Sequence, residues 1–432
     1  MSIEHMSGNA AILDQLDPER KLAVTFLGRE YRSPLVVASG TLVERAEEIE
    51  PYMQAGAGAV IPRSTRFVME RTVHPSPHLY QEGKGSSASM INGEWTGAAI
   101  EYWRPHLEMM AGEEAMTIMS VSGRDIEGCV KVCKELDEYK FPLIEVNVSC
   151  GVSNGVHGYI TRDEQHVRTL IRSLKDAGIE TPISLKLGHS DVIINLSGIA
   201  AEEGVDAISA VNTYGPVFDF RIGENGRPER VIGVTGAKGG LSGSELFHTA
   251  LTDVAEISRQ VKIPVLASGG VMNAEKAVKM MMAGASLVQL YSLLHVKGIH
   301  APAAVTTFTK DMVKYLDDKK IESAESIIGG ALELMEEPTE LAPQIPLVNL
   351  MGCIGCNACI RVCLPDAIKE VPADNTIGHV IEIHEEACVG CGHCVTQCPV
   401  PDVLMMPQQG ASLRGNRPLL SLSLASDSVR SE

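Results

Sequence analysis

The 432-residue sequence lacks several features that mark particular classes of protein. No run approaches the roughly 20 apolar residues of a membrane-spanning helix. Residues 1–15 have neither a basic start nor a long apolar core, so we expect no secretory leader. Basic residues are also scarce, because 37 Lys and Arg against 55 Asp and Glu give a net charge of −18. This balance disfavours nucleic acid or an anionic membrane as a partner.

The sequence also lacks a convincing glycine-rich fingerprint for a nicotinamide nucleotide. That fingerprint follows a strand and opens a helix. Here Gly56-Ala57-Gly58 precedes a predicted strand, and the stretch from Gly233 to Gly239 falls in a loop. We therefore expect no nicotinamide-binding fold within this chain.

Cysteine has the most informative pattern. Eight of the eleven cysteines form two quartets with the spacing C-x2-C-x2-C-x3-C, and Pro399 follows the second. The two-residue gaps let successive thiolates converge on one inorganic core, and the three-residue step sends the fourth cysteine to the neighbouring core. The pattern predicts two [4Fe-4S] clusters. The first would be held by Cys353, Cys356, Cys359 and Cys398, and the second by Cys388, Cys391, Cys394 and Cys363.

Zinc is the competing interpretation, since paired C-x2-C motifs also bind zinc. A duplicated quartet with a three-residue step fits zinc poorly, and a disulfide framework is typical of small secreted domains. Leu364 stands where a proline usually follows the fourth cysteine, a change that removes no ligand. Because thiolate ligands need reducing conditions during assembly, we expect a cytoplasmic protein.

Short β-branched strands alternate with amphipathic helical patterns from residue 35 to about residue 300. The predicted strands are Leu35–Ala38, Ala59–Pro62, Thr117–Val121, Leu143–Val148, Ile183–Leu187, Ala207–Val211, Val265–Ala267 and Leu287–Leu290. The helical patterns include Ala46–Ala55, Ile126–Tyr139, Asp163–Ala177, Val192–Glu203, Gly243–Gln260 and Asn273–Ala283. Eight buried strands, each followed by a helix, predict an α/β fold, the closed (β/α)8 TIM barrel. The alternative is an open doubly wound sheet, which would need a ligand loop where the strand order reverses.

The chain is expected to divide into five segments. An N-terminal extension (1–20) precedes the barrel (21–316), which opens with a hairpin turning at Gly28 and ends with a helix at Pro302–Leu316. Residues 317–346 are predicted to hold a connecting helix, Ile321–Glu336, and a proline-bearing linker. A two-cluster ferredoxin-like domain covers 347–406, and the polar tail 407–432 is expected to be mobile.

Polar residues at the carboxyl ends of the strands are the first candidates for chemistry, because barrel active sites lie there. The fourth strand ends in Asn147-Val148-Ser149-Cys150, the fifth carries Lys186, and the sixth ends in Asn212-Thr213. Ser268-Gly269-Gly270 follows the seventh strand, and Tyr291-Ser292 follows the eighth. Paired glycines before a helix are typical of a phosphate cradle. A lysine inside an apolar strand needs a partner for its charge, and a reduced flavin is such a partner.

These motifs together resemble the dihydroorotate dehydrogenase superfamily of FMN-dependent (β/α)8 barrels. The likeness includes Ser33 to Gly40 at the first strand and Gly239-Gly240-Leu241-Ser242-Gly243, besides the strand ends given above. The attached cysteine-rich domain points to the pyrimidine-reducing branch, the dihydropyrimidine dehydrogenases. The stretch Met90-Ile91-Asn92-Gly93-Glu94, followed by Tyr102-Trp103, also resembles that branch more than it resembles the substrate loop of the orotate enzymes.

The resemblance implies a role for each matching residue. Cys150 would be the general acid that protonates a substrate carbon while FMN delivers hydride to the adjacent one. A planar amide-containing ring would be bound by Asn92, Glu94, Asn147, Ser149, Asn212 and Thr213. FMN would be bound by Ala38, Ser39, Gly40, Arg63, Ser64, Lys186, Gly240, Ser242, Gly269, Gly270, Tyr291 and Ser292.

Elementary chemistry agrees with these roles. Side-chain amides offer donors and acceptors at once, which suits a ring with alternating C=O and N–H groups. A free cysteine thiol is mostly protonated at neutral pH, as a general acid must be. The alternative to a catalytic role is that Cys150 is a small buried residue that only fills space. We expect Cys129 and Cys133 to be core residues of this kind.

Two departures from the family pattern leave the substrate open. Gly151 stands where proline usually follows the active cysteine, so the loop after it should be more pliable. Arg63 stands where the family usually has lysine, and its planar fork makes contacts that an ammonium does not. The substrate is expected to be a uracil-like ring or another conjugated cyclic amide or carbonyl compound.

The clusters predict how the flavin is supplied with electrons. Because the chain has no nicotinamide fold of its own, an NAD(P)H-oxidising flavoprotein partner is expected to pass electrons through the clusters, in a homodimer or hetero-oligomer. The alternatives are a dihydroorotate-type oxidation that sends electrons outward, a transfer-RNA dihydrouridine synthase, and a non-catalytic electron-transfer subunit. The net charge of −18 and the ferredoxin-like domain argue against the transfer-RNA enzyme.

Overall fold

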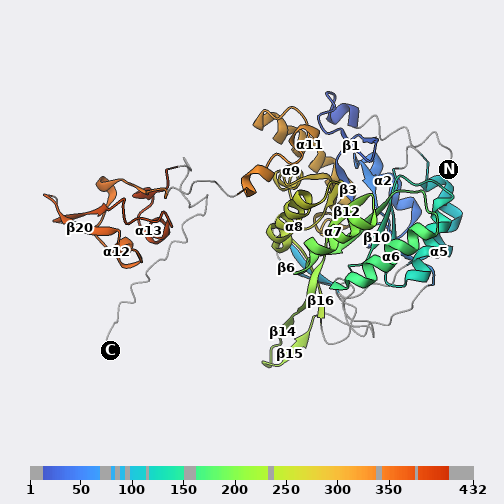
Figure 1. The fold of residues 1–432 in the computed structure, drawn as a ribbon, viewed down its shortest axis with the longest axis horizontal. Helices are drawn as coiled ribbons and strands as arrows, with labels where there is room; N and C mark the ends of the chain where they lie inside the picture. Colours follow the sequence, from blue (N-terminus) through green and yellow to red (C-terminus); the bar gives the residue numbers. More distant parts are fainter. Residues whose placement is uncertain are drawn as a thin grey trace. The chain divides into compact units, whose positions relative to one another are not determined.

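The chain divides into two compact units, residues 1–336 and 337–432 (Figure 1). The computed structural model describes residues 13–68, 79–82, 88–92, 98–112, 116–149, 162–231, 238–336, 343–374 and 378–407. Within these ranges no helix combines the length and apolar character needed to cross a membrane.

Eight parallel strands form the centre of the first unit within the described ranges. In sheet order they are β4 (Ala59–Val60), β3 (Leu35–Val37), β18 (Ala285–Leu290), β17 (Val265–Ala267), β12 (Ala207–Asn212), β11 (Ile183–Gly188), β10 (Ile144–Asn147) and β9 (Met119–Ser122). The ring closes where Val60 pairs in parallel with Thr117, just before β9. There the N–H of Ile118 donates to the carbonyl of Val60 at 3.0 Å. The predicted barrel is confirmed, and the open-sheet alternative is wrong.

Amphipathic helices surround the strands (Figure 1). They are α2 (Ile49–Gln54), α5 (Ile126–Asp137), α6 (Glu164–Asp176), α7 (Ile193–Glu203), α8 (Phe247–Gln260), α9 (Ala274–Met282) and α11 (Ala301–Lys319). In α6 the buried apolar residues Val167, Leu170, Ile171 and Leu174 follow the helical period, and the Asp163 side chain caps the first turn by accepting from the N–H of His166. The six helical patterns predicted between the strands and the last barrel helix, Pro302–Leu316, each lie within a few residues of their expected ranges.

The hairpin that opens the unit also turns where the sequence predicts. Strands β1 (Val24–Phe26) and β2 (Arg29–Tyr31) are antiparallel and are joined by Leu27 and Gly28. Both linking residues have positive φ, 49° and 74°, as a tight two-residue hairpin turn requires. The sequence suggested a second hairpin strand from Tyr31 to Val37, but β2 ends at Tyr31 and the chain enters the barrel as the separate strand β3.

A smaller antiparallel sheet joins segments that are far apart in the sequence. Its strands are β13 (Tyr214–Phe218), β16 (Lys238–Gly243), β7 (Ser89–Asn92) and β6 (Leu79–Glu82), in that order. The hairpin β14–β15 (Phe220–Ile222 and Pro228–Arg230) extends from it (Figure 1). Two short strands, β5 (Thr65–Arg66) and β8 (Ala98–Ala99), continue the barrel sheet beyond β9. None of these strands was predicted from the sequence, although Met90-Ile91-Asn92 in β7 and Gly239–Gly243 in β16 belong to the motifs that resemble the family.

The predicted connecting helix, Ile321–Glu336, is wrong. The structure has two short 3-10 turns there, Glu325–Ile327 and Leu332–Met335. Gly329 between them has a φ of 77°, and its N–H donates to Met281, at the end of α9, at 2.9 Å. The N–H of Ala331 likewise donates to Met282 at 2.9 Å. Backbone donors that a helix would use internally therefore tie this segment to the barrel, and the division between units falls after residue 336.

The second unit is small and has little apolar core. Its elements are the strand pairs β19 (Leu347–Val348) with β22 (Leu404–Met405) and β20 (Ile368–Pro372) with β21 (His379–Ile383), and the helices α12 (Ala358–Arg361) and α13 (His393–Gln397). The buried cluster among its described residues is Cys359, Ile368, Ile381, Cys394, Val395, Cys398, Val403 and Leu404. A core this small usually depends on a bound metal group for stability.

We predict that Gly58→Ala destabilises the barrel. A β-carbon at this position would overlap the backbone carbonyl oxygen of Ser33, which cannot rotate away as a side chain would. The expected loss is about 1–3 kcal/mol of unfolding free energy, measured by thermal or denaturant unfolding. Gly112→Ala is the matched control, because the nearest atom to its β-carbon would be the carbonyl oxygen of Met109 at 3.4 Å. Equal melting curves for the two variants would contradict the prediction.

Candidate functional site

A charged pair lies buried inside the barrel. The ammonium of Lys186, on β11, donates to Glu145 Oε1 on β10 at 3.1 Å and to Gln289 Oε1 on β18 at 2.8 Å. The other oxygen of Glu145 accepts from Gln289 Nε2 at 2.7 Å and from Ser209 Oγ on β12 at 2.9 Å. The side chains of Lys186 and Glu145 are only 4% and 0% exposed. Strand β18 does not adjoin β10 or β11, so these contacts cross the barrel interior.

Only Lys186 of this group was predicted from the sequence. Glu145, Ser209 and Gln289 were missed, although each is a polar residue within an otherwise apolar strand. Glu145 also lies two positions before Asn147, so both side chains leave the strand on the same face. That alternation was the available signal. A buried ion pair is costly to desolvate, so its presence here calls for satisfied hydrogen bonds, and the structure supplies four.

The carboxyl ends of β10 and β12 bring four of the predicted substrate residues together. Asn147 Oδ1 accepts from the N–H and the hydroxyl of Ser149 at 3.0 and 2.8 Å, and from Asn212 Nδ2 at 3.3 Å. Asn212 Nδ2 also lies 2.9 Å from Ser149 Oγ, and Asn212 Oδ1 accepts from the N–H of Thr213 at 2.8 Å. The result is a compact set of amide and hydroxyl groups at the rim, able to bind a ligand that both donates and accepts.

The small sheet adds a neighbouring surface to this set. Asn92 pairs with Gly240 across β7 and β16, and a β-carbon on Gly240 would lie 2.5 Å from Thr213 Oγ1. Glycine at 240 therefore allows the strand to approach Thr213 closely, and Ser242 lies opposite Met90 on the same strand pair. Cys150, Glu94 and the side chain of Asn92 lie outside the described residues, so their predicted roles stay predictions.

A line of hydroxyl groups runs along the side of the barrel formed by the first strands. Ser39 Oγ lies 3.3 Å from Ser64 Oγ, which lies 2.8 Å from the buried Ser120 Oγ on β9. Ala38, just before Ser39, donates its N–H to Leu290 on β18 at 3.0 Å. Three predicted cofactor residues, Ala38, Ser39 and Ser64, therefore lie around the same end of the barrel.

Tyr291 packs against the glycine that follows the first strand. A β-carbon on Gly40 would collide with the Tyr291 ring, so only glycine allows this contact. The Tyr291 hydroxyl lies 2.9 Å from Thr41 Oγ1 and 3.4 Å from His295 Nδ1. Burial raises the pKa of the Tyr291 phenol and lowers the pKa of His295. Both groups are therefore favoured in their neutral forms at this site.

Arg63 is held by a carboxylate. Its Nη1 donates to Glu44 Oε1 at 2.6 Å, and its side chain is 17% exposed. Burial lowers the pKa of the Arg63 guanidinium, and Glu44 opposes that shift. An arginine side chain stays charged at any physiological pH, so this residue adds a positive charge near the ends of the first strands.

The glycine pair after β17 forms a tight backbone turn. Gly269 and Gly270 have φ values of 117° and 70°, a region that favours glycine. A β-carbon on Gly270 would lie 2.6 Å from the carbonyl oxygen of Gly243 and 2.8 Å from the backbone nitrogen of Phe247, at the start of α8. Ser292, at the start of the short helix α10 (Ser292–His295), is buried after β18. Backbone approach, hydroxyl groups and buried cations together fit a phosphate-bearing flavin.

A histidine–aspartate pair at the end of β11 was not predicted. His189 Nδ1 lies 2.7 Å from Asp253 Oδ2 on α8, and the His189 ring lies 5.3 Å from the ring of Tyr214. Burial raises the pKa of Asp253, and the hydrogen bond with His189 opposes that rise. The pair ties the strand end to α8 and contacts the start of β13, which follows the Asn212-Thr213 rim.

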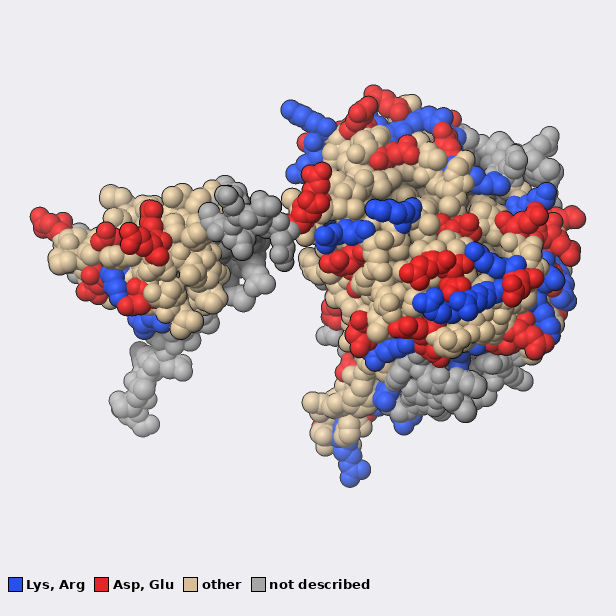
Figure 2. Space-filling model, viewed as in Figure 1, with Lys and Arg blue, Asp and Glu red and all other residues tan. Residues whose placement is uncertain are grey.

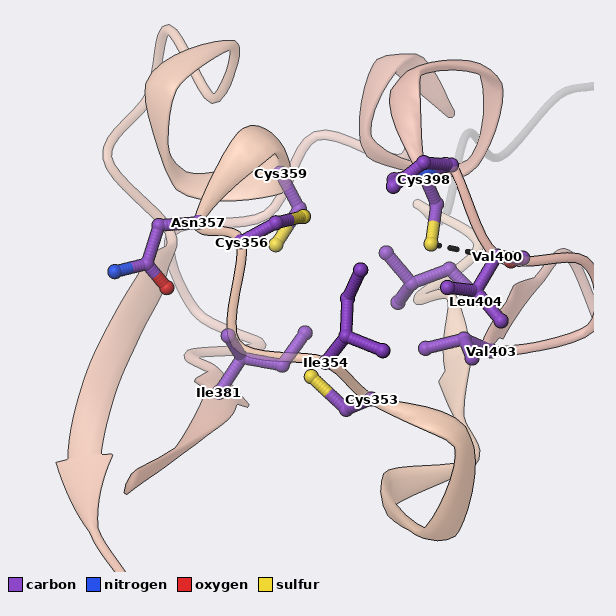
Figure 3. A pocket seen from close by; sticks show the side chains of 11 residues that line it. Cys353, Ile354, Cys356, Asn357, Cys359, Ile381, Cys398, Val400, Val403 and Leu404 are labelled. Atoms are coloured by element: carbon purple, nitrogen blue, oxygen red, sulfur yellow. Dashed lines mark hydrogen bonds between the residues drawn. The ribbon is translucent and has the colours of Figure 1, made fainter. Parts of the chain in front are cut away.

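The first predicted cysteine set lines one cavity in the second unit. Cys353, Cys356, Cys359 and Cys398 surround about 330 Å³ of space not filled by atoms, part of it open to solvent. Figure 3 shows these four side chains around a common space that Ile354 and Leu404 also line. Cys398 comes from the second quartet, so the fold brings the fourth cysteine of one quartet to the other, as the spacing predicts.

The second set lines a separate cavity of the same size. Cys363, Cys388, Cys391 and Cys394 surround about 330 Å³, with Pro346, Pro365, Ile368, Ile383 and His393 among the other lining residues. Burial raises the pKa of the Cys359 thiol, and raises that of Cys394 to about 11. Bound iron would therefore be needed to keep these sulfurs deprotonated. The C-x2-C-x2-C-x3-C spacing and the sharing of cysteines between the two cavities fit two iron–sulfur clusters.

Two family models match the chain. The dihydroorotate dehydrogenase model matches residues 21–312, more than half of the chain. The chain belongs to the dihydroorotate dehydrogenase family. Residues 352–401 match the model of the 4Fe-4S dicluster domain. This protein is therefore a dihydroorotate dehydrogenase-family oxidoreductase acting on CH–CH bonds, joined to a C-terminal 4Fe-4S ferredoxin domain. Membership of the family implies FMN as the cofactor.

Several curated relatives are catalytic subunits of NAD⁺-dependent dihydroorotate dehydrogenase B. The protein from Methanothermobacter thermautotrophicus is 28% identical over 308 residues, which are 70% of this chain and 95% of the relative. The protein from Citrifermentans bemidjiense is 30% identical over 319 residues, 72% of this chain and 98% of the relative. A crystal structure of DHODH from Eimeria tenella in complex with ferulenol has the same fold, with a TM-score of 0.58 at 18% identity, and covers 76% of this chain and 95% of its own.

We predict that each cluster takes three cysteines from one quartet and its fourth cysteine from the other quartet. Cys398→Ala should cost about four iron atoms per chain, and Cys353→Ala the same four, since both line one cavity. The double variant Cys353→Ala/Cys398→Ala should lose no more iron than either single one, whereas Cys353→Ala/Cys363→Ala should lose both clusters. Iron analysis and electron paramagnetic resonance of anaerobic protein give the measurement.

Cys133→Ala is the control for this series, because Cys133 is buried in α5 of the other unit. It should keep the full iron content. If Cys353→Ala/Cys398→Ala lost all iron and Cys353→Ala/Cys363→Ala lost half, each quartet would hold its own cluster, and the predicted exchange would be wrong.

Proposed function

We propose that this protein reduces a C=C bond of a uracil-like ring to the dihydro form. FMN bound in the barrel would supply the hydride. The observation that carries the proposal is the set of amide and hydroxyl groups at Asn147, Ser149, Asn212 and Thr213. Such groups match a neutral ring whose edge alternates C=O and N–H.

The proposed chemistry needs one proton donor on the substrate. Cys150 follows Ser149 directly, so it belongs to the same strand end as the amide set. It would give its thiol proton to one ring carbon while the neighbouring carbon accepts hydride. Asn147 and Asn212 would bind the ring edge, with Asn92 and Glu94 near it and Ser149 and Thr213 orienting the amides.

The C-terminal domain supplies electrons in this proposal. Two [4Fe-4S] clusters, one in each cysteine-lined cavity, would carry single electrons toward FMN from an NAD(P)H-oxidising flavoprotein partner in the cytoplasm. The partner is supported by the absence of a nicotinamide fingerprint in the sequence and by the name of the relatives, which are catalytic subunits of NAD⁺-dependent enzymes. The assembly would be a homodimer or a hetero-oligomer.

A second candidate is the reverse flow of electrons, from dihydroorotate through FMN to the clusters. The relatives' names favour it. Orotate carries a carboxylate, so this substrate would need a cation free to pair with it at the rim. Arg63 is paired with Glu44, and Lys186 is paired with Glu145 in the barrel interior. The pairing of these two cations, taken within the described part of the barrel, favours a neutral ring.

We predict that uracil-like compounds, and not orotate, reoxidise the reduced flavin. Anaerobic protein reduced with an artificial donor is mixed with uracil, thymine or orotate, and the return of flavin absorbance is followed in a stopped-flow instrument. Reoxidation by uracil or thymine should be at least tenfold faster than by orotate, because one well-matched ligand is worth about 1.4 kcal/mol or more over the other. NADPH added to the chain alone should leave the flavin oxidised.

Faster reoxidation by orotate, together with flavin reduction by dihydroorotate, would replace the proposal with the second candidate. Robust turnover of NADPH by the chain without a partner would contradict the proposed electron route and leave the substrate assignment standing.

We predict that Cys150→Ala slows substrate reduction by about 10²–10⁴-fold, the usual contribution of a positioned general acid. Flavin reduction by the artificial donor should keep its rate, because that step needs no substrate proton. Cys129→Ala is the control: this cysteine is buried in α5, away from the strand ends. Substrate reduction by Cys150→Ala at the rate of the wild type would contradict the role of Cys150 as the proton donor.

A further inference from the structure

The barrel interior contains a closed triangle of polar groups that the proposed reaction does not use. Lys186 donates to Glu145 and to Gln289, and Gln289 donates to Glu145, so each of the three contacts the other two. The side chains come from β11, β10 and β18, three strands that converge only because the sheet closes into a barrel.

We propose that Glu145 and Gln289 are positioning residues for the Lys186 ammonium, and that the Glu145 carboxylate offsets part of its positive charge so that bound FMN remains a ready hydride donor. This inference rests on the FMN site of the proposed function and goes beyond it, because it concerns the reduction potential of the flavin and not the substrate.

The hydrogen bonds leave Lys186 one direction for a further contact. An ammonium has three N–H donors, and in the described part of the chain Glu145 and Gln289 take one each. Glu145 cannot follow the lysine if it moves, because Ser209 and Gln289 hold its second oxygen at 2.9 and 2.7 Å. The ammonium is therefore fixed from two sides, with its remaining donor available to an acceptor such as the N1–C2 carbonyl edge of a flavin.

The charges act in opposite directions on a flavin. Reduction adds negative charge to the ring, so a nearby ammonium stabilises the reduced form and raises the potential, whereas a carboxylate lowers it. Both groups lie in an interior where salt does not screen them, and their side chains are 4% and 0% exposed. Lysine alone would stabilise reduced FMN and raise its reduction potential. The neighbouring carboxylate reduces this stabilisation.

Glutamate at position 145 supplies both acceptors and a negative charge. Its two oxygens accept from Lys186, Ser209 and Gln289, whereas a glutamine would offer one oxygen and would turn an NH2 donor toward part of this set. Glutamine keeps the size of the side chain and removes the charge. Glu145→Gln therefore tests the charge when a variant that also removes the Lys186 charge is measured beside it.

The experiment measures the two-electron midpoint potential of FMN in the full-length, cluster-loaded protein, by anaerobic titration against reference dyes at fixed pH and ionic strength. Glu145→Gln should raise the potential by at least the equivalent of a tenfold change in the equilibrium constant, about 30 mV for a two-electron couple. Glu203→Gln is the matched control, since Glu203 is also an ion-paired carboxylate, held by Arg168 and Arg172 on the helical layer. It should leave the potential unchanged.

A double variant guards against a folding defect and tests the route of the effect. Glu145→Gln/Lys186→Gln removes both charges and keeps amide groups able to hydrogen-bond, and it should abolish the rise seen in Glu145→Gln. A rise that persists in the double variant would overturn the inference, because the effect would not pass through the Lys186 charge. An unchanged or lower potential in FMN-loaded Glu145→Gln would overturn it as well.

Failure of this inference is distinct from failure of the proposed function. FMN-loaded protein that reduces no cyclic amide would contradict the proposed substrate while the potentials could still be measured. Unchanged potentials in a protein that reduces uracil would overturn only the role given to Glu145. A wild-type chain that binds no FMN would overturn both.

Discussion

The buried ion pair of Lys186 and Glu145 is the constraint on which the organisation of the barrel centre depends. Removing one member of such a pair leaves an uncompensated charge and typically costs about 3–5 kcal/mol. The surrounding strands must therefore supply hydrogen bonds as well as apolar packing, and Ser209 and Gln289 do so. This requirement explains why polar residues interrupt strands that are otherwise apolar along their length, and why the polar groups continue to the rim at Asn147 and Asn212.

The two units differ in what stabilises them. The barrel has a large continuous apolar core. The surface of this unit shows acidic and basic side chains interspersed over its helices (Figure 2), as in the pairing of Glu203 with Arg168 and Arg172. The ferredoxin unit instead packs its few apolar residues around two cysteine-lined cavities, so its stability and its electron transfer would come from the same clusters.

Local patterns were reliable where one physical cause dominated. The alternation of strands and helices predicted the barrel. Parallel strands that are buried on both faces must be apolar along most of their length, and this makes them recognisable in the sequence. The three-residue step before Cys363 and Cys398 predicted which cysteines share a cavity, and the described structure brings those sets together. The prediction of a helix at residues 321–336 was wrong because Gly329 has a positive φ and donates its N–H to the end of α9, which interrupts the helical hydrogen bonds. The strands β13 to β16 had no clear pattern in the sequence, and β16 pairs with β7, more than a hundred residues earlier in the chain.

The sequence by itself determined the barrel, the two cysteine sets and the candidate strand-end residues, because each follows from a spacing or a period within a short stretch of chain. It did not determine which groups surround Lys186. Glu145 and Gln289 are 144 residues apart, and each alone looks like an isolated polar residue in an apolar strand. Only closure of the sheet brings them onto one ammonium, because residues on non-adjacent strands meet inside a barrel and nowhere else. The tertiary structure thus decided that the lysine is held together with a carboxylate, and the potential of the flavin is expected to depend on that pairing.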